Sequence, residues 1–293
     1  MRTRTNAVVL SALALAGALA LAGCTDSGAT DPETAPEETT ETVEFPAGST
    51  MAALSEAGAM TVGTKFDQPL FGQVDASGDP QGFDVEIAKI IAAELGIADS
   101  GITWTESVSA TREPFFVSGG DDIGVHTHTL TDPRKESVSF AGPYYEAGQD
   151  FLVLAGNPEG IEGPDDVAGK PVCTVAGSTS EKNIAEYTDQ VTALGGYAEC
   201  LPLLSSGQVV AVTTDNVILA GLAANSGGEF EVVGNPFTAE PYGIGLALED
   251  TEFRNWINDV LEAAYADGRW AAAWQATAGT VLPLPDPPAV NRY

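Results

Sequence analysis

Basic side chains are scarce in this 293-residue chain. It contains 12 Lys and Arg against 42 Asp and Glu, and its formal net charge is -30. A protein that binds nucleic acid needs clustered Lys and Arg to replace the counterions of the phosphates. The composition therefore excludes nucleic acid as a partner, and it argues against adhesion of the folded body to anionic lipid.

Familiar catalytic signatures are also missing. The sequence has no glycine-rich phosphate loop, no Gly-x-Ser-x-Gly motif and no helical His-Glu pair with a second His. Its two histidines, His126 and His128, share one face of an expected strand, and such a pair can bind zinc, but the spacing marks no third ligand. No Ser or Thr has an evident His base beside it. We therefore predict no metal, no cofactor and no catalytic residue.

The N-terminus has the pattern of a secretory leader. Arg2 and Arg4 precede an apolar run over residues 7–20, which is short for a transmembrane span. Leu-Ala-Gly-Cys at 21–24 resembles a bacterial lipobox, which implies cleavage before Cys24 and lipid attachment to its sulfur. A plain secretory leader with an incidental Cys24 is the alternative. We predict a lipoprotein signal peptide over 1–23 and a location on the extracellular face of the membrane.

The residues that follow Cys24 are mostly Thr, Pro, Glu, Ala, Ser and Gly. Residues 25–50 carry seven acids and no base. Such a segment buries too little apolar surface to offset its ordering entropy. We predict a lipidated cysteine and a disordered acidic tether over 24–54, which keep the folded body near the membrane.

Cys173 and Cys200 are the remaining cysteines. Outside the cytoplasm a cysteine pair is more often a disulfide than a metal site. Each cysteine lies near the edge of an expected strand, at 172–175 and 199–202, and neighbouring strands of a βαβ unit approach within bridging distance. We predict a disulfide, with two free thiols as the alternative.

The rest of the chain alternates short apolar strands with amphipathic helices, which predicts an α/β architecture with mainly parallel sheets. Residues 283–293 are expected to form a loose tail. The expected strands are 60–64, 102–104, 122–126, 151–154, 172–175, 209–213 and 244–248, and the expected helices are 83–95, one that starts near 181, and 253–265.

Arg134 is a candidate anion-binding residue. It follows a run of hydroxyl residues and precedes a Pro/Gly/Tyr turn, in a chain with few positive charges. A planar guanidinium binds a carboxylate through two hydrogen bonds, which fixes its orientation. The alternative is an ordinary surface residue near Asp132 and Glu136.

Four further positions have both a structural and a functional interpretation. Lys65 follows a strand, where side chains of an open α/β sheet meet the ligand. Arg112 begins a helix and needs a compensating anion, either Glu113 or a ligand. Residues 177–180 offer a helix N-terminus that binds an anion or is simply capped. Asp215 caps a helix or pairs with an ammonium group.

Taken together, these segments resemble the polar amino-acid binding proteins of bacterial ABC importers, the family 3 extracellular solute-binding proteins. They are most similar to the glutamate-binding lipoproteins of actinobacteria, over about residues 60–274. The segments that carry the resemblance are Lys65-Phe-Asp-Gln-Pro, Gly82-Phe-Asp-Val-Glu-Ile-Ala-Lys89, Arg112-Glu-Pro, Thr129-Leu-Thr-Asp-Pro-Arg134, Phe140-Ala-Gly-Pro-Tyr-Tyr145, Cys173-Thr-Val-Ala-Gly-Ser-Thr-Ser180 and Thr213-Thr-Asp-Asn216.

The resemblance implies a two-lobed, type II periplasmic-binding-protein-like fold with two hinge strands and a ligand cleft between the lobes. Lobe 1 is expected over 55–148 plus 241–279, lobe 2 over 149–240, and a tail over 280–293. Carried over by motif, Arg134 holds the ligand α-carboxylate, Asp215 pairs with its ammonium group, and Lys65 and Arg112 face the side chain. The supporting residues are Thr127, Thr129, Ser178 and Thr179.

The implied function is capture of an acidic amino acid, with glutamate favoured, and its delivery to an ABC importer permease by a monomeric protein. Binding of glutamine, aspartate or another polar amino acid is the nearest alternative. A dehydratase-like enzyme, which needs a general acid such as Glu106, Glu113 or a histidine, and a ligand sensor are others. This chain departs from the family pattern at His126, at His128 and at the acidic turn 119–122.

Overall fold

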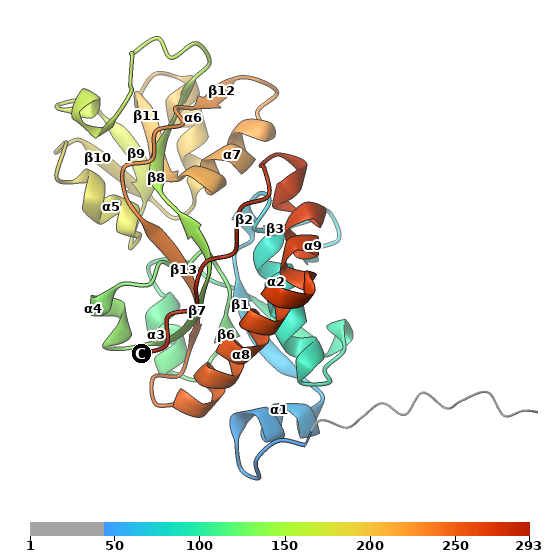
Figure 1. Cartoon of the computed structure of the whole chain (residues 1–293). Helices are drawn as coiled ribbons and strands as arrows, with labels where there is room; N and C mark the ends of the chain where they lie inside the picture. The colour runs from blue at the N-terminus through green and yellow to red at the C-terminus, as the bar shows by residue number, and fades with distance from the viewer. Residues whose placement is uncertain (1–43) are drawn as a thin grey trace, which may run out of the picture. The chain divides into compact units, whose positions relative to one another are not determined.

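The computed structural model describes residues 44–293. The predicted signal peptide, Cys24 and the predicted tether as far as residue 43 lie outside the described residues. Within 44–293, Figure 1 shows two groups of strands and helices, one at each end, joined by long strands. We call the group that contains β1 lobe 1 and the group that contains β9 lobe 2.

Lobe 1 is built on a five-stranded sheet of order β5-β1-β6-β13-β7. The pairs β5–β1 and β1–β6 are parallel, whereas β13 runs antiparallel to β6 and β7. A small antiparallel sheet, β2-β3-β4, lies against α2. The bounds are β1 Met60–Thr64, β2 Asp67–Gln68, β3 Gly72–Val74, β4 Pro80–Gln81, β5 Ile102–Glu106, β6 Ile123–Gly124, β7 Ser139–Ala147 and β13 Glu240–Leu246.

Lobe 2 contains a second five-stranded sheet of order β10-β9-β11-β8-β12. Here β10, β9 and β11 are parallel, and β8 is antiparallel to β11 and β12. Both sheets are therefore mixed, and the prediction of mainly parallel sheets was wrong, because the strands that connect the lobes run against their neighbours. The bounds are β8 Gln149–Leu154, β9 Val172–Val175, β10 Val191–Leu194, β11 Ala211–Asp215 and β12 Phe230–Val232.

Helices cover the sheets through their apolar faces. The helix predicted over 83–95 is confirmed as α2, in which Phe83, Ile87 and Ile91 are buried at a spacing of four residues. In the core of lobe 1 the ring centroids of Phe83 and Trp274 lie 5.1 Å apart. The helices are α1 Thr50–Ala57, α2 Phe83–Glu94, α3 Arg112–Val117, α4 Asp132–Lys135, α5 Thr179–Ile184, α6 Leu201–Ser205, α7 Asn216–Ala224, α8 Thr251–Asp267 and α9 Arg269–Ala276, with 3-10 turns η1 Asp99–Gly101, η2 Pro164–Val167, η3 Tyr197–Cys200 and η4 Ala278–Thr280.

The chain crosses between the two sheets twice. It leaves lobe 1 at Gly148, the single residue between β7 and β8, and it returns through β13. Glu240, the first residue of β13, lies opposite Ala147, the last residue of β7. The two crossings are therefore side by side, which is the arrangement expected of two hinge strands.

The disulfide prediction is confirmed. Cys173 and Cys200 are bonded, with their Cα atoms 5.7 Å apart. Cys173 lies in β9 as expected, but the strand predicted at 199–202 is wrong. Cys200 ends η3, and Pro202 lies in the first turn of α6, where a proline favours the start of a helix.

Two terminal predictions also need correction. The tether was expected to reach residue 54, yet α1 begins at Thr50, because Ser49 caps it and Met51 and Leu54 are buried. The tail is not loose, although its last residues, 283–293, form no helix or strand. The Tyr293 ring lies 4.2 Å from the Arg254 guanidinium. This cation–π contact holds the C-terminal tail against lobe 1.

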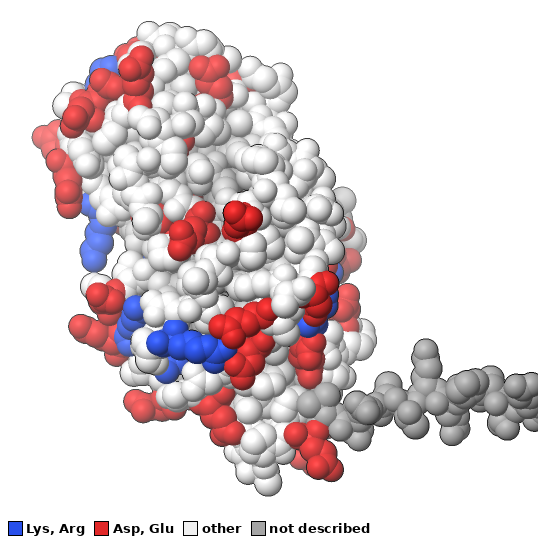
Figure 2. Space-filling view, viewed as in Figure 1, with Lys and Arg blue, Asp and Glu red and all other residues white. Residues whose placement is uncertain are grey.

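Acidic side chains are spread over the visible surface of both lobes, with only small groups of Lys and Arg (Figure 2). None of the helices within residues 44–293 is long and apolar enough to span a bilayer.

Candidate ligand-binding site

A small polar cavity lies where the two lobes meet, with a volume of about 10 Å³ in this closed arrangement. It brings together six of the eight residues predicted to bind the ligand, whereas Lys65 and Arg134 are not in its wall. Lobe 1 contributes Gln68, Ser109, Arg112, Thr127 and Thr129, and lobe 2 contributes Ser178, Thr179, Ser180, Tyr197, Asp215 and Ile218.

Asp215 supplies a negative charge to the cavity. It ends β11 and is buried. Tyr242 of β13 donates a hydrogen bond to Oδ2 at 2.6 Å, but Oδ1 is buried and accepts none from residues 44–293. Burial raises the pKa of Asp215 to about 7. A buried carboxylate oxygen that accepts no hydrogen bond is suited to accept one from an ammonium group.

Arg112 supplies a positive charge from the opposite lobe. It begins α3, as predicted, and is buried. Nη1 donates to the carbonyl oxygen of His126 at 3.3 Å, while Nε has no hydrogen-bond partner in the described chain. Burial, with the nearby charge of Arg134, lowers the pKa of Arg112. The cavity is therefore lined by a cation on lobe 1 and an anion on lobe 2.

Arg134 lies beside the cavity and bridges the lobes. Its Nε is 2.9 Å from Oε1 of Glu113. Nη1 donates to the carbonyl oxygen of Thr129 at 3.0 Å, and Nη2 donates to that of Gly177 in lobe 2 at 3.3 Å. A guanidinium has five N–H donors. Within residues 44–293, two of the five thus remain available to a carboxylate.

Lys65 is buried one side chain away from the cavity. Its Nζ donates to Oγ of Ser109 at 2.9 Å, and Ser109 lines the wall. Burial and the charge of Arg112 lower the pKa of Lys65 to about 7. Because the Ser109 oxygen accepts this bond, its own hydrogen is available to an acceptor in the cavity.

The predicted threonines are held in place by different means. Thr127 has a φ of 49°, in the left-handed region that is uncommon for threonine. Its N–H donates to Oδ2 of Asp84 at 2.9 Å, and Tyr144 donates to Oδ1 at 2.7 Å. The hydroxyl oxygens of Thr129 and Thr179 lie 3.4 Å apart across the lobes. The lobes therefore touch directly at the cavity.

Ser178 has both roles that the sequence allowed. It is the N-cap of α5, where its Oγ accepts from the N–H of Glu181 at 3.0 Å. It also lines the cavity. Its hydroxyl group donates to the carbonyl oxygen of Val175 at 2.7 Å, which fixes the side chain at the wall.

The two histidines do not line the cavity. Both are buried, with ring centroids 4.9 Å apart, and Nε2 of His128 is 3.1 Å from Glu113. Burial lowers the pKa of each, which keeps the rings neutral. No group of three or more His, Cys, Asp or Glu within 44–293 has a metal-binding arrangement. Glu113 also pairs with Arg134, so it links His128 to the edge of the site.

Several residues of the site were not singled out in the sequence. The wall includes Gln68, Ser109, Tyr197 and Ile218. Gln68 and Ser109 belong to the segments around Lys65 and Arg112, but nothing in a single sequence shows which polar residue of a loop faces inward. Tyr197 lies on η3, where a strand edge was expected.

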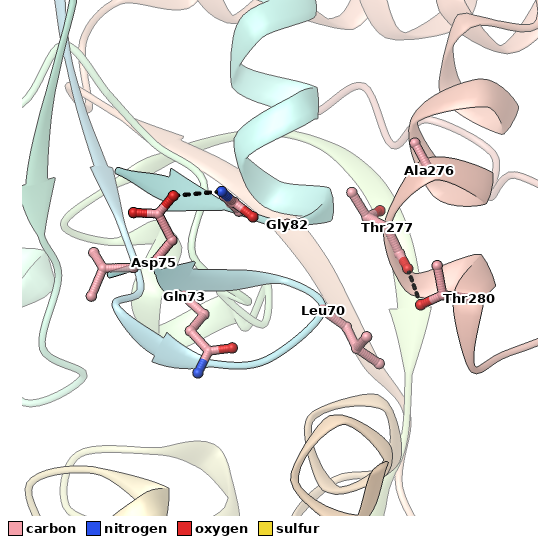
Figure 3. Close-up of a pocket in the computed structure, with 9 residues that line it drawn as sticks. Leu70, Gln73, Asp75, Gly82, Ala276, Thr277 and Thr280 are labelled. Carbon is pink, nitrogen blue, oxygen red and sulfur yellow. Dashed lines mark hydrogen bonds between the residues drawn. The ribbon is translucent and has the colours of Figure 1, made fainter. Parts of the chain in front are cut away.

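A second hollow, of about 240 Å³, lies between β3, β4 and the end of α9 (Figure 3). Its polar groups are largely engaged with each other or with the backbone. Gln81 donates to Asp75 at 2.8 Å, and the hydroxyl groups of Thr277 and Thr280 donate to backbone carbonyl oxygens at 2.7 Å. The smaller cavity, with buried groups that lack partners, is therefore the better candidate site.

This geometry agrees with a comparison of the sequence with known families. Residues 60–276 match the model of the bacterial extracellular solute-binding proteins, family 3. The chain belongs to this family. The match confirms both the predicted resemblance and the predicted two-lobed α/β fold.

Two curated relatives in this family differ in the ligand that they are named for. The chain is 38% identical over 234 residues to the glutamate-binding protein GluB of Corynebacterium efficiens, which covers 75% of this chain and 79% of that protein. It is also 38% identical over 225 residues to the glutamine-binding protein GlnH of Bacillus subtilis, covering 75% and 81%.

A solved structure is similar along most of its length. It is an ancestral amino-acid-binding protein that is a precursor of cyclohexadienyl dehydratase, with a TM-score of 0.71 and 30% identity over 78% of this chain and 99% of that one. Similarity of sequence and fold thus identifies a solute-binding protein but does not distinguish glutamate from glutamine.

Proposed function

We propose that this protein captures an acidic amino acid, glutamate in preference to others, by closure of its lobes. It then delivers the amino acid to an ABC importer permease. The observation that carries the proposal is the pair of opposite buried charges in one cavity, Arg112 from lobe 1 and Asp215 from lobe 2. The ammonium group of an acidic amino acid can pair with Asp215 and its side-chain carboxylate with Arg112, whereas an uncharged sugar can pair with neither.

In this proposal the ligand ammonium group binds to Oδ1 of Asp215, which has no partner among the described residues. The α-carboxylate binds the remaining donors of Arg134 together with Thr129, Ser178 and Thr179. Thr127 completes the wall. Because both lobes contribute, the ligand binds the closed form more tightly than the open form, and this difference drives closure.

The preference for an acidic side chain rests on the cations of lobe 1. Arg112 lines the cavity, and Lys65 reaches it through Ser109. A ligand without a side-chain acceptor leaves these groups desolvated and unpaired, which costs binding free energy. Micromolar affinity corresponds to about -8 kcal/mol, which a few charge-assisted hydrogen bonds in a dry cavity can supply.

The wider setting comes from the leader and the domain limits. We propose that Cys24 is lipidated and holds a monomer at the extracellular face of the membrane. We also propose the limits 55–148 plus 241–279 for lobe 1, extended back to the start of α1 at Thr50, and 149–240 for lobe 2. They are supported by the end of β7 at Ala147 and the starts of β8 at Gln149 and of β13 at Glu240.

A dehydratase remains a different class of function, suggested by the ancestral protein named above. Such an enzyme requires a general acid that reaches the substrate. Asp215 is the only carboxyl group among the cavity-lining residues of the described chain, and we assign it to the ligand ammonium group. Neither Glu106 nor Glu113 is in the wall. We therefore do not propose this activity.

A thermal-shift panel with each of the twenty amino acids tests the proposal. Glutamate should raise the melting temperature most, with glutamine or aspartate next. The Asp215→Ala variant is the matched control and should show no shift. A panel in which no amino acid stabilises the wild type contradicts the proposal.

A further inference from the structure

Gly221 lies at a point where the two lobes touch. It is in the interior of α7 in lobe 2, and α7 lies next to β2 of lobe 1. A Cβ atom at this position would lie 2.4 Å from the carbonyl oxygen of Pro69 and 3.0 Å from its carbonyl carbon. Those atoms are backbone, so they cannot turn away as a side chain can. An alanine at 221 is therefore incompatible with this contact.

This contact borders the ligand cavity. Pro69 directly follows Gln68, and Ile218 lies one helical turn before Gly221 on α7. Gln68 and Ile218 both line the cavity, from opposite lobes. The approach of α7 to Pro69 thus sets the distance between two walls of the site.

We propose that Gly221 is a positioning residue for ligand capture, because its missing side chain allows α7 to close onto Pro69. The inference rests on the proposed capture of an amino acid by lobe closure. Gly221 does not line the cavity, so it acts through the position of the lobe and not through contact with the ligand.

The proposal predicts effects of opposite sign on stability and on binding. Alanine is a better helix former than glycine, and α7 has ordinary helical geometry at 221. With the lobes apart, Gly221→Ala should raise the melting temperature of the ligand-free protein by about 1–4 °C. Because the closed form becomes rarer, glutamate affinity should fall by roughly ten-fold or more. A purely structural role predicts a lower melting temperature instead.

Gly196→Ala is the matched control. Gly196 is also in lobe 2 and also faces lobe 1, but its Cβ would meet Oδ2 of Asp67, at 2.6 Å. That atom is the end of a flexible side chain, and the φ of Gly196 is -141°, which alanine adopts freely. This variant should bind glutamate within about two-fold of the wild type.

A second readout does not depend on any ligand. The hydroxyl groups of Thr129 and Thr179 lie 3.4 Å apart across the lobes, so Thr129→Cys with Thr179→Cys should form a disulfide only in the closed form. Adding Gly221→Ala to this pair should slow formation of that disulfide under mild oxidation by at least ten-fold, and adding Gly196→Ala should leave the rate unchanged.

The experiment combines calorimetric titration of glutamate and glutamine, ligand-free melting and the cross-linking rate. Weaker binding, a raised melting temperature and slower cross-linking for Gly221→Ala support the inference. Binding within two-fold of the wild type, or an equal cross-linking rate, overturns it. If the wild type binds no amino acid, the proposed function fails, and the cross-linking rates alone decide whether Gly221 controls closure.

Discussion

Tyr242 donates a hydrogen bond to Asp215 across the junction of the lobes, with 2.6 Å between Oη and Oδ2. Tyr242 belongs to β13, which returns to lobe 1, and Asp215 ends β11 of lobe 2. The bond fixes the carboxyl group and leaves Oδ1 buried and without a partner in residues 44–293. Burial of an oxygen without a hydrogen bond costs free energy, and a bound ammonium group would remove that cost.

Asp215→Asn should therefore weaken glutamate binding by about 100-fold or more, because the ammonium group loses its counter-charge inside a desolvated cavity. Tyr242→Phe should weaken glutamate binding by about ten-fold, since it removes only the hydrogen bond that orients the carboxyl group. Isothermal titration calorimetry measures both. Equal affinities of wild type and Asp215→Asn would remove Asp215 from the site.

Binding should depend on pH through the same carboxyl group. Burial raises the pKa of Asp215 to about 7 in the ligand-free protein, and an ammonium group needs the ionised form. Affinity should fall by up to about ten-fold per pH unit below pH 7. Because the pKa of Lys65 is also lowered to about 7, loss of its charge should reduce glutamate affinity at higher pH. Affinity that is constant between pH 5 and 8 would contradict this assignment.

The pKa of Asp215 also has a consequence for stability. Its folded value lies above the ordinary value of 3.8, so protonation favours the folded state. This contribution is fully present below pH 4 and is lost as the pH rises through 7. Ligand-free Asp215→Asn should accordingly lose less stability than the wild type between pH 4 and 7, as judged by melting curves.

Much of this architecture follows from the sequence. The stripe of Phe83, Ile87 and Ile91 predicted α2, and the cysteine pair predicted the disulfide. Local patterns did not reveal that β13 returns antiparallel, because that depends on where a distant strand pairs. They also could not show that the Lys65 side chain ends in a hydrogen bond to Ser109 and does not line the cavity, because packing decides the direction of a side chain.

Lys65→Met tests whether Lys65 selects an acidic side chain on the ligand. Lys65 reaches the cavity only through Ser109, so its charge acts on a side-chain carboxylate at short range. The variant should weaken glutamate about ten-fold more than glutamine, and Ser109→Ala should reduce the same preference. Equal losses for the two ligands would place Lys65 outside the selection of the side chain.

The disulfide should contribute to stability without entering the site. Cys173 and Cys200 close a loop with a sequence separation of 27. Replacing both with serine should reduce the free energy of unfolding by about 2–4 kcal/mol. Denaturant unfolding of the double variant measures the loss, with glutamate affinity as the control. Unchanged stability would contradict the prediction.

Arg134 joins Glu113, Thr129 and Gly177, and it is the residue assigned to the α-carboxylate. Arg134→Ala should remove a lobe contact and the carboxylate donors together, so binding should fall by at least 100-fold. Arg134→Lys keeps the charge but loses the planar guanidinium, so its affinity for glutamate should lie between those of the wild type and Arg134→Ala.

The most direct test of the central claim is calorimetric titration of L-glutamate into the wild-type protein and into Arg134→Ala at pH 7.5. The account predicts one site per chain with roughly micromolar affinity in the wild type and no measurable heat of binding in the variant. Equal affinity in the two proteins, or no binding to the wild type, would contradict it.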